Sequence, residues 1–197
     1  GEEQMLFARL SVFQGDFDML AVKAVTGATV IILSALLDKS LIRRAVPGRY
    51  DMHGLLRQYA AERLAADPPT LAQTRERYAR HFAAFLAQQE VHLAGMEKER
   101  VLFEIALEIE NVRHTWQLAV LHGWDDVIEQ SLGSLYDFYR VRGRFSEGVT
   151  LLVSVLESWF PQVMRDLDVD NKTQPLCFDE PFVPKSLSSL VEVMGVD

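Results

Sequence analysis

The 197-residue sequence contains a single cysteine and no long hydrophobic run. With Cys177 alone, an intrachain disulfide framework and a cysteine-rich zinc site are both excluded. The longest apolar run, residues 28–37, is much shorter than the roughly 20 apolar residues that a membrane helix needs. The first residues show no basic stretch before an apolar block, so they do not look like a signal peptide. We therefore expect a cytoplasmic protein with no membrane partner.

The sequence also lacks an excess of positive charge. It holds 20 Lys and Arg against 28 Asp and Glu, for a formal net charge of −8. Residues 1–66 hold eight basic and seven acidic side chains, a balance of +1, whereas the rest of the chain is acidic. Binding to nucleic acid depends on clustered Lys and Arg. Only the first segment is therefore a candidate for DNA contact.

Motifs for catalysis, metal binding and nucleotide binding are absent as well. The five histidines show no H-E-x-x-H spacing, and no G-x-x-x-x-G-K-[ST] phosphate-binding loop occurs. No Ser/His/acid or Cys/His grouping indicates an activated nucleophile. We expect this chain to be no enzyme and to bind neither a metal nor a cofactor by itself.

The helical and turn signals that are present predict a winged helix over residues 1–66. Helical spacing of apolar residues predicts helices near residues 5–13, 18–25 and 29–38. The third is nearly all apolar, and we expect it to be buried on most sides. Two β-prone runs, residues 40–46 and 49–52, flank Pro47-Gly48, a turn signal that predicts a two-stranded wing. A fourth helix over residues 55–64 ends before Pro68-Pro69, the predicted domain boundary.

The remaining sequence divides into a helical domain and a tail. Residues 70–161 predict four helices joined by tight glycine turns, as in stacked antiparallel helical hairpins. In the second of these helices the apolar residues share one face, which places Glu104, Glu108 and Asn111 on the outside. Residues 162–197 form a Pro-containing acidic tail that is either flexible or docked on the helices. The predicted fold class is thus mainly α, with one short β-hairpin.

Three segments resemble the winged-helix part of bacterial STAND proteins, which are signal-transduction ATPases with a nucleotide domain of the NB-ARC type. The segments read LFARLSVF at residues 6–13, LLDKSLI at 36–42 and RYDMHGLLRQYA at 49–60. Two further segments, ENVR at residues 110–113 and YRVRGRFSEG at 139–148, resemble the tetratricopeptide-like region that commonly follows. The resemblance implies a tetratricopeptide-like fold for the predicted helical hairpins.

The resemblance also implies a function and a site. His53 falls on the middle residue of the family's Met-His-Asp motif, where the histidine senses the bound nucleotide; the third residue here is Gly54. The alternative is a purely structural role, in which His53 packs under the wing at the start of a helix. The family implies that this chain is the regulatory part of a larger switch whose parent protein binds ATP and ADP. Its partners would be the nucleotide-binding domain of the same parent chain and a protein or small-molecule trigger on the helical repeats.

The alternative is a winged-helix transcriptional regulator that binds DNA. Its candidate contacts are three arginines on the predicted wing, Arg43, Arg44 and Arg49. However, the helix that would enter the major groove, residues 28–37, has no basic or amide side chain to read base edges. On this ground we expect DNA not to be a partner.

Overall fold

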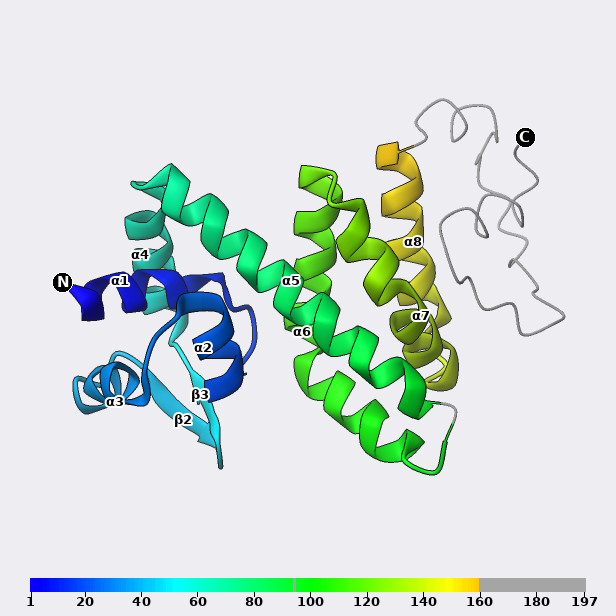
Figure 1. Cartoon of the computed structure of the whole chain (residues 1–197), viewed down its shortest axis with the longest axis horizontal. Helices are drawn as coiled ribbons and strands as arrows, with labels where there is room; N and C mark the ends of the chain where they lie inside the picture. Colours follow the sequence, from blue (N-terminus) through cyan, green and yellow to red (C-terminus); the bar gives the residue numbers. More distant parts are fainter. Residues whose placement is uncertain (94, 160–197) are drawn as a thin grey trace, which may run out of the picture. The chain divides into compact units, whose positions relative to one another are not determined.

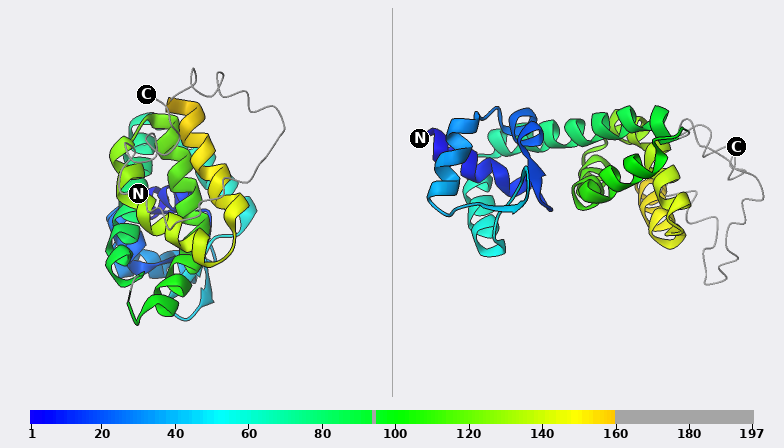
Figure 2. Two further views of the ribbon diagram at one scale, coloured as in Figure 1. Left: turned by 90° about the vertical axis from the view of Figure 1, so that its right-hand side faces the viewer. Right: turned by 90° about the horizontal axis from the view of Figure 1, so that it is seen from below.

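The computed structural model describes residues 1–93 and 95–159, which form eight α-helices and one three-stranded antiparallel sheet (Figures 1 and 2). They fall into two compact units. Unit 1 comprises Gly1–Ala83 and Glu104–Thr115, and unit 2 comprises Ala84–Phe103 and the chain from Trp116 onward. The mainly helical fold class that the sequence predicts is confirmed.

Unit 1 has the element order of a winged helix. Its helices and strands are α1 (Glu2–Arg9), a 3₁₀ turn (Leu10–Val12), β1 (Phe17–Asp18), α2 (Met19–Thr26), α3 (Val30–Asp38), β2 (Arg43–Val46), β3 (Arg49–Asp51) and α4 (Gly54–Ala65). Strand β3 is the central strand, with β1 and β2 antiparallel on either side. The predicted hairpin is present as β2 and β3, with Gly48 at φ 80° in the turn between them. Strand β1 was not predicted, because two residues are too few to show an alternating pattern.

The core of unit 1 is built on aromatic rings from distant parts of the sequence. The rings of Phe13 and Phe17 lie 4.7 Å apart between centroids, and Phe13 meets Tyr78 edge-on at 5.4 Å. Tyr78 and Phe82 come from the first part of helix α5 (Pro68–Leu93). All four side chains are buried, so this part of α5 belongs to the same core as the winged helix.

Helix α3 departs from its prediction. Only Leu33 and Leu36 are buried, whereas Val30 is 60% exposed and Ile31 is 81% exposed. A single helix of nine residues buries one side against the core and leaves the other in solvent. The expectation that this apolar helix is buried on most sides is therefore wrong.

Unit 2 consists of the second part of α5, parts of α6 (Lys98–His122), α7 (Asp125–Val141) and α8 (Phe145–Trp159). Helices α7 and α8 pack against each other, as both figures show. The predicted glycine turns are confirmed, since Gly123 and Gly143 adopt φ of 65° and 66° at the ends of α6 and α7. Buried polar contacts connect the helices: Trp116 Nε1 donates to Ser131 Oγ at 2.9 Å. The tetratricopeptide-like character of this packing stays a prediction.

The division into units differs from the sequence-based boundaries. Pro68 and Pro69 begin α5 instead of separating two domains, because the first turn of a helix tolerates residues without an N–H. The two units share α5 and α6 between them. The predicted tail, residues 162–197, lies outside the described residues. No single helix in the described ranges is long and apolar enough to cross a membrane; α2 and α3 qualify only as a pair, and they are bent by 110°.

Candidate functional site

Helices α2 and α3 form a compact helix–turn–helix whose turn is held by side-chain hydrogen bonds. Asp18 caps α2 by accepting from the Ala21 amide at 2.7 Å. At the other end, Gly27 adopts φ 75°, a left-handed conformation that ends the helix at little steric cost. Thr26 Oγ1 donates to the Val22 carbonyl at 2.7 Å and accepts from the Ala28 amide at 3.1 Å. These bonds set the direction in which α3 leaves the turn.

The outer face of α3 is apolar and hydroxylic. Its exposed positions are the N-cap Thr29, then Val30 and Ile31 in the first turn, and Ser34 one turn further on. The first charged residue of the helix is Asp38 at its carboxyl end. Leu33 and Leu36 on the opposite side anchor the helix in the core. This face is thus presented to solvent by a firmly packed helix.

The β2–β3 wing places two of the three predicted arginines in solvent. Arg43 Nη2 contacts Asp51 Oδ2 across the hairpin at 2.7 Å, and 68% of its side chain is exposed. Arg44 is exposed and takes part in none of the ion pairs found in the described part of the chain. Arg44 thus offers an exposed guanidinium group, whereas the guanidinium of Arg43 is bonded to Asp51 at the surface of the wing.

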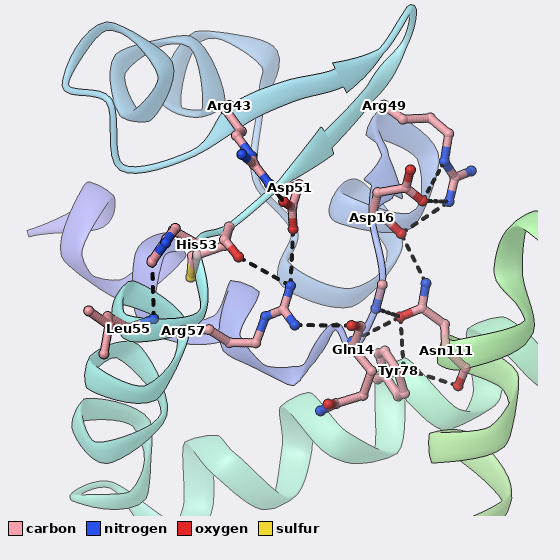
Figure 3. A network of polar contacts seen from close by, with 12 residues as sticks. Gln14, Asp16, Arg43, Arg49, Asp51, His53, Leu55, Arg57, Tyr78 and Asn111 are labelled. Atoms are coloured by element: carbon pink, nitrogen blue, oxygen red, sulfur yellow. Dashed lines mark hydrogen bonds and ion pairs between the residues drawn. The ribbon is translucent and has the colours of Figure 1, made fainter.

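Arg49, the third predicted wing arginine, points inward instead (Figure 3). Its guanidinium lies 2.8 Å from Asp16 Oδ1. It also lies 2.5 Å from Glu108 Oε1, and only 11% of its side chain is exposed. Burial alone would lower the pKa of Arg49, but the hydrogen bonds and charges of Glu108 and Asp16 outweigh it and raise the pKa. Arg49 therefore stays charged and connects the wing to the part of α6 in unit 1.

Asn111 on α6 is the centre of the same network (Figure 3). Its Oδ1 accepts from the Gln14 and Gly15 amides at 3.0 and 3.3 Å and from the Tyr78 hydroxyl at 3.1 Å. Its Nδ2 donates to the Asp16 carbonyl at 3.0 Å and to the carboxylate of neighbouring Glu108 at 2.9 Å. The loop that leads into β1 is thereby held by one amide side chain.

The prediction that Asn111 and Glu108 face outward is wrong. Asn111 has no exposed surface, and Glu108 is 8% exposed. The apolar periodicity of α6 identifies one buried face correctly, but polar side chains on the adjacent face are covered in unit 1 by the loop at residues 14–16 and by Arg49. Tyr78 shares this environment: burial raises its pKa well above the ordinary value, and the charge of Glu108 adds to the effect.

His53 lies at the start of α4, as the sequence predicts. It is the N-cap residue, its Nδ1 accepts weakly from the Leu55 amide at 3.4 Å, and its side chain is exposed (Figure 3). An open hollow of about 440 Å³ lies beside it, with Asp51 and Arg57 in its lining. Arg57 is engaged there by the Gln14 carbonyl at 3.0 Å and by Asp51 Oδ1 at 3.1 Å. The role of His53 as a nucleotide sensor stays a prediction.

A metal site is not apparent in the described ranges. No group of three or more His, Cys, Asp or Glu side chains lies close enough together there to hold an ion. The carboxylates of Asp16 and Asp51 are instead paired with arginines, Asp16 with Arg49 and Asp51 with Arg57.

Comparison with known proteins agrees with this geometry. Residues 2–65, which include α1 to α4 and all three strands, match the family of winged helix-turn-helix domains. Residues 2–65 form a winged helix-turn-helix domain. Proteins of Mycobacterium bovis and Mycobacterium tuberculosis that are named as HTH-type transcriptional regulators are 29% identical to the chain over 165 residues. The matched region covers 79% of this chain but only 18% of those relatives. No solved structure matches the chain significantly.

These findings overturn the expectation that DNA is not a partner. A winged helix-turn-helix domain is a DNA-binding architecture, and the relatives are named as regulators of transcription. The expectation failed because it required hydrogen-bonding side chains on α3, whereas apolar and hydroxyl groups also contact base edges. The matches support the winged helix, but they do not extend to the STAND assignment.

Proposed function

We propose that the winged helix-turn-helix domain binds duplex DNA and that the chain is part of a transcriptional regulator. The observation that carries this proposal is the exposed outer face of α3. Val30 and Ile31 remain 60% and 81% exposed on a helix whose other side is fixed in the core. In helix-turn-helix proteins the second helix lies in the major groove and its first residues contact the base edges. Val30 and Ile31 occupy those positions in α3.

The wing supplies the charge that α3 lacks. Arg43 and Arg44 are exposed on β2, while no charged side chain precedes Asp38 on α3. Contacts between arginines and phosphates fix the orientation of a protein on the duplex without reading its sequence. Two arginines on the wing would release few counterions, so we expect the wing contacts to add only a weak dependence of the affinity on salt.

Fluorescence polarisation with labelled 30-base-pair duplexes tests the proposal. The 197-residue chain should bind saturably at about 0.1 M salt, and Arg44→Glu should weaken binding at least ten-fold by placing a negative charge against a phosphate. Arg77→Glu is the matched control, because Arg77 is an exposed arginine of unit 1 on α5. An absence of binding to any duplex, or equal losses in both variants, would refute the proposal.

A second candidate function is a nucleotide-dependent switch of the STAND type. One observation favours it: His53 is exposed at the amino-terminal end of α4, where free backbone N–H groups favour an anion such as ADP. In the longest natural chain that contains these residues, His53→Ala should reduce the ADP retained after purification. Gln58→Ala, an exposed change on the same helix, should not. Equal ADP content in the two variants would exclude this function.

A further inference from the structure

We infer that α3 selects A·T base pairs by contacting the 5-methyl group of thymine. This inference rests on the proposed function, since it requires that residues 2–65 bind DNA. It goes further by assigning the chemical group on the DNA that the exposed helix recognises.

The side chains on α3 restrict what the helix can read. Bidentate recognition of guanine uses Arg or Lys, and bidentate recognition of adenine uses Asn or Gln. The outer face of α3 carries none of these; it offers the hydroxyls of Thr29 and Ser34 and the aliphatic side chains of Val30 and Ile31. Hydroxyl groups accept or donate to any base pair and discriminate poorly. The aliphatic pair therefore carries the selectivity.

The position of the aliphatic pair fits this role. Val30 and Ile31 are adjacent in the first turn of α3, the part of a recognition helix that reaches deepest toward the bases. The thymine methyl is the apolar group that natural base pairs present in the major groove. Burying Ile31 against it removes apolar surface of both partners from water.

The wing explains how an uncharged helix face is held against a polyanion. Arg43 and Arg44 bring positive charge to the same domain, so they supply contacts with phosphate while α3 supplies contacts with bases. Other strongly exposed apolar residues of the domain, Leu20 and Leu55, lie on α2 and α4. They are therefore suited to serve as controls for α3.

Four duplexes of equal length distinguish the effect of the methyl group on binding from the effect of the base pair. Their sequences contain A·T pairs, A·U pairs with deoxyuridine, G·C pairs, or G·C pairs with 5-methylcytosine. The 197-residue chain should bind A·T more tightly than A·U, and 5-methylcytosine more tightly than cytosine. The expected ratio is about four-fold for each buried methyl group. Ile31→Ser should bring both ratios toward one, whereas Leu55→Ser should leave them unchanged.

Each outcome distinguishes this inference from the proposed function. Equal binding to all four duplexes, or equal binding to A·T and A·U with weaker binding to both G·C probes, overturns methyl recognition but leaves DNA binding intact. Ratios that persist in the folded Ile31→Ser variant overturn the assignment to α3. An absence of binding to every duplex overturns both proposals. Circular dichroism of each variant confirms that the helices are retained.

Discussion

Replacing Asn111 with alanine should destabilise unit 1 strongly, although the sequence pattern places Asn111 on the outer face of its helix. The amide of Asn111 makes hydrogen bonds to the Gln14 and Gly15 amides, the Asp16 carbonyl, the Tyr78 hydroxyl and the Glu108 carboxylate. Asn111→Ala removes all of them at once. The loop that leads into β1 then loses its attachment to α6.

The size of the effect follows from what each partner retains. The Tyr78 hydroxyl keeps a second bond, because it also donates to the backbone carbonyl of residue 111 at 3.0 Å. The other four bonds have no replacement at residue 111. Each contributes about 1 kcal/mol net, so we expect a loss of about 3–4 kcal/mol in the free energy of unfolding.

The assay must report unit 1 separately, because the two units need not unfold together. Hydrogen exchange of peptides from residues 1–83 during a urea titration meets this need. The midpoint for Asn111→Ala should fall by about 1–2 M urea.

Thr115 is the matched control, one turn further along the same helix. Its hydroxyl is buried and has no hydrogen-bond partner among the described residues. Thr115→Val should therefore leave stability unchanged or raise it, since an unsatisfied polar atom is removed. If Asn111→Ala behaves like Thr115→Val, the network does not hold the loop and the reasoning fails.

Three further predictions concern the turn after α2, the half-buried His81 and the wing. Gly27→Ala should cost about 1–2 kcal/mol in thermal unfolding because φ at this position is 75°; an unchanged melting temperature would contradict the left-handed turn. Burial lowers the pKa of His81 from 6.5, so its neutral form stabilises the fold above pH 6.5 and this contribution is lost as pH falls. His81→Gln should flatten the dependence of the melting temperature on pH between about 7 and 5. A curve as steep as that of the unmodified chain would contradict a role of His81 in this dependence. Arg44→Ala should reduce the slope of log K against log salt for DNA by about 0.9, whereas an identical slope would show that Arg44 touches no phosphate.

The local signals of the sequence predict the elements of unit 1 well. Pro47-Gly48 identifies the wing, and Gly27 marks the end of α2, because these turns depend on residues within the turn itself. Arg43 and Arg44 lie exposed on this wing, and their contact with DNA stays a prediction. Such features need no knowledge of the rest of the chain.

The polar network could not be predicted, because it depends on contacts between distant residues. Asn111 meets Gln14 across 97 positions, and Arg49 meets Glu108 across 59. A helical wheel separates apolar from polar faces, but it does not show which polar face another segment covers. For this reason Asn111 and Glu108 were expected in solvent, and Arg49 was grouped with Arg43 and Arg44 as a candidate DNA contact.

For α3 the sequence predicted burial where the structure shows exposure. An almost continuous apolar run predicts burial, yet the run does not reveal that only one side of a nine-residue helix meets the core. The exposed remainder is the surface that we assign to DNA. The charge balance of the whole chain argued against DNA binding, but the binding that we propose would involve only the few side chains of one face.

The most direct test of DNA recognition by α3 and the wing is a polarisation titration of labelled A·T duplex with the chain and with Ile31→Glu. A negative charge on the exposed face should abolish binding while the circular dichroism spectrum stays unchanged, because Ile31 is 81% exposed. Saturable binding by the parent chain and its loss in the variant are the predicted result. Equal binding curves for the two proteins would contradict the account.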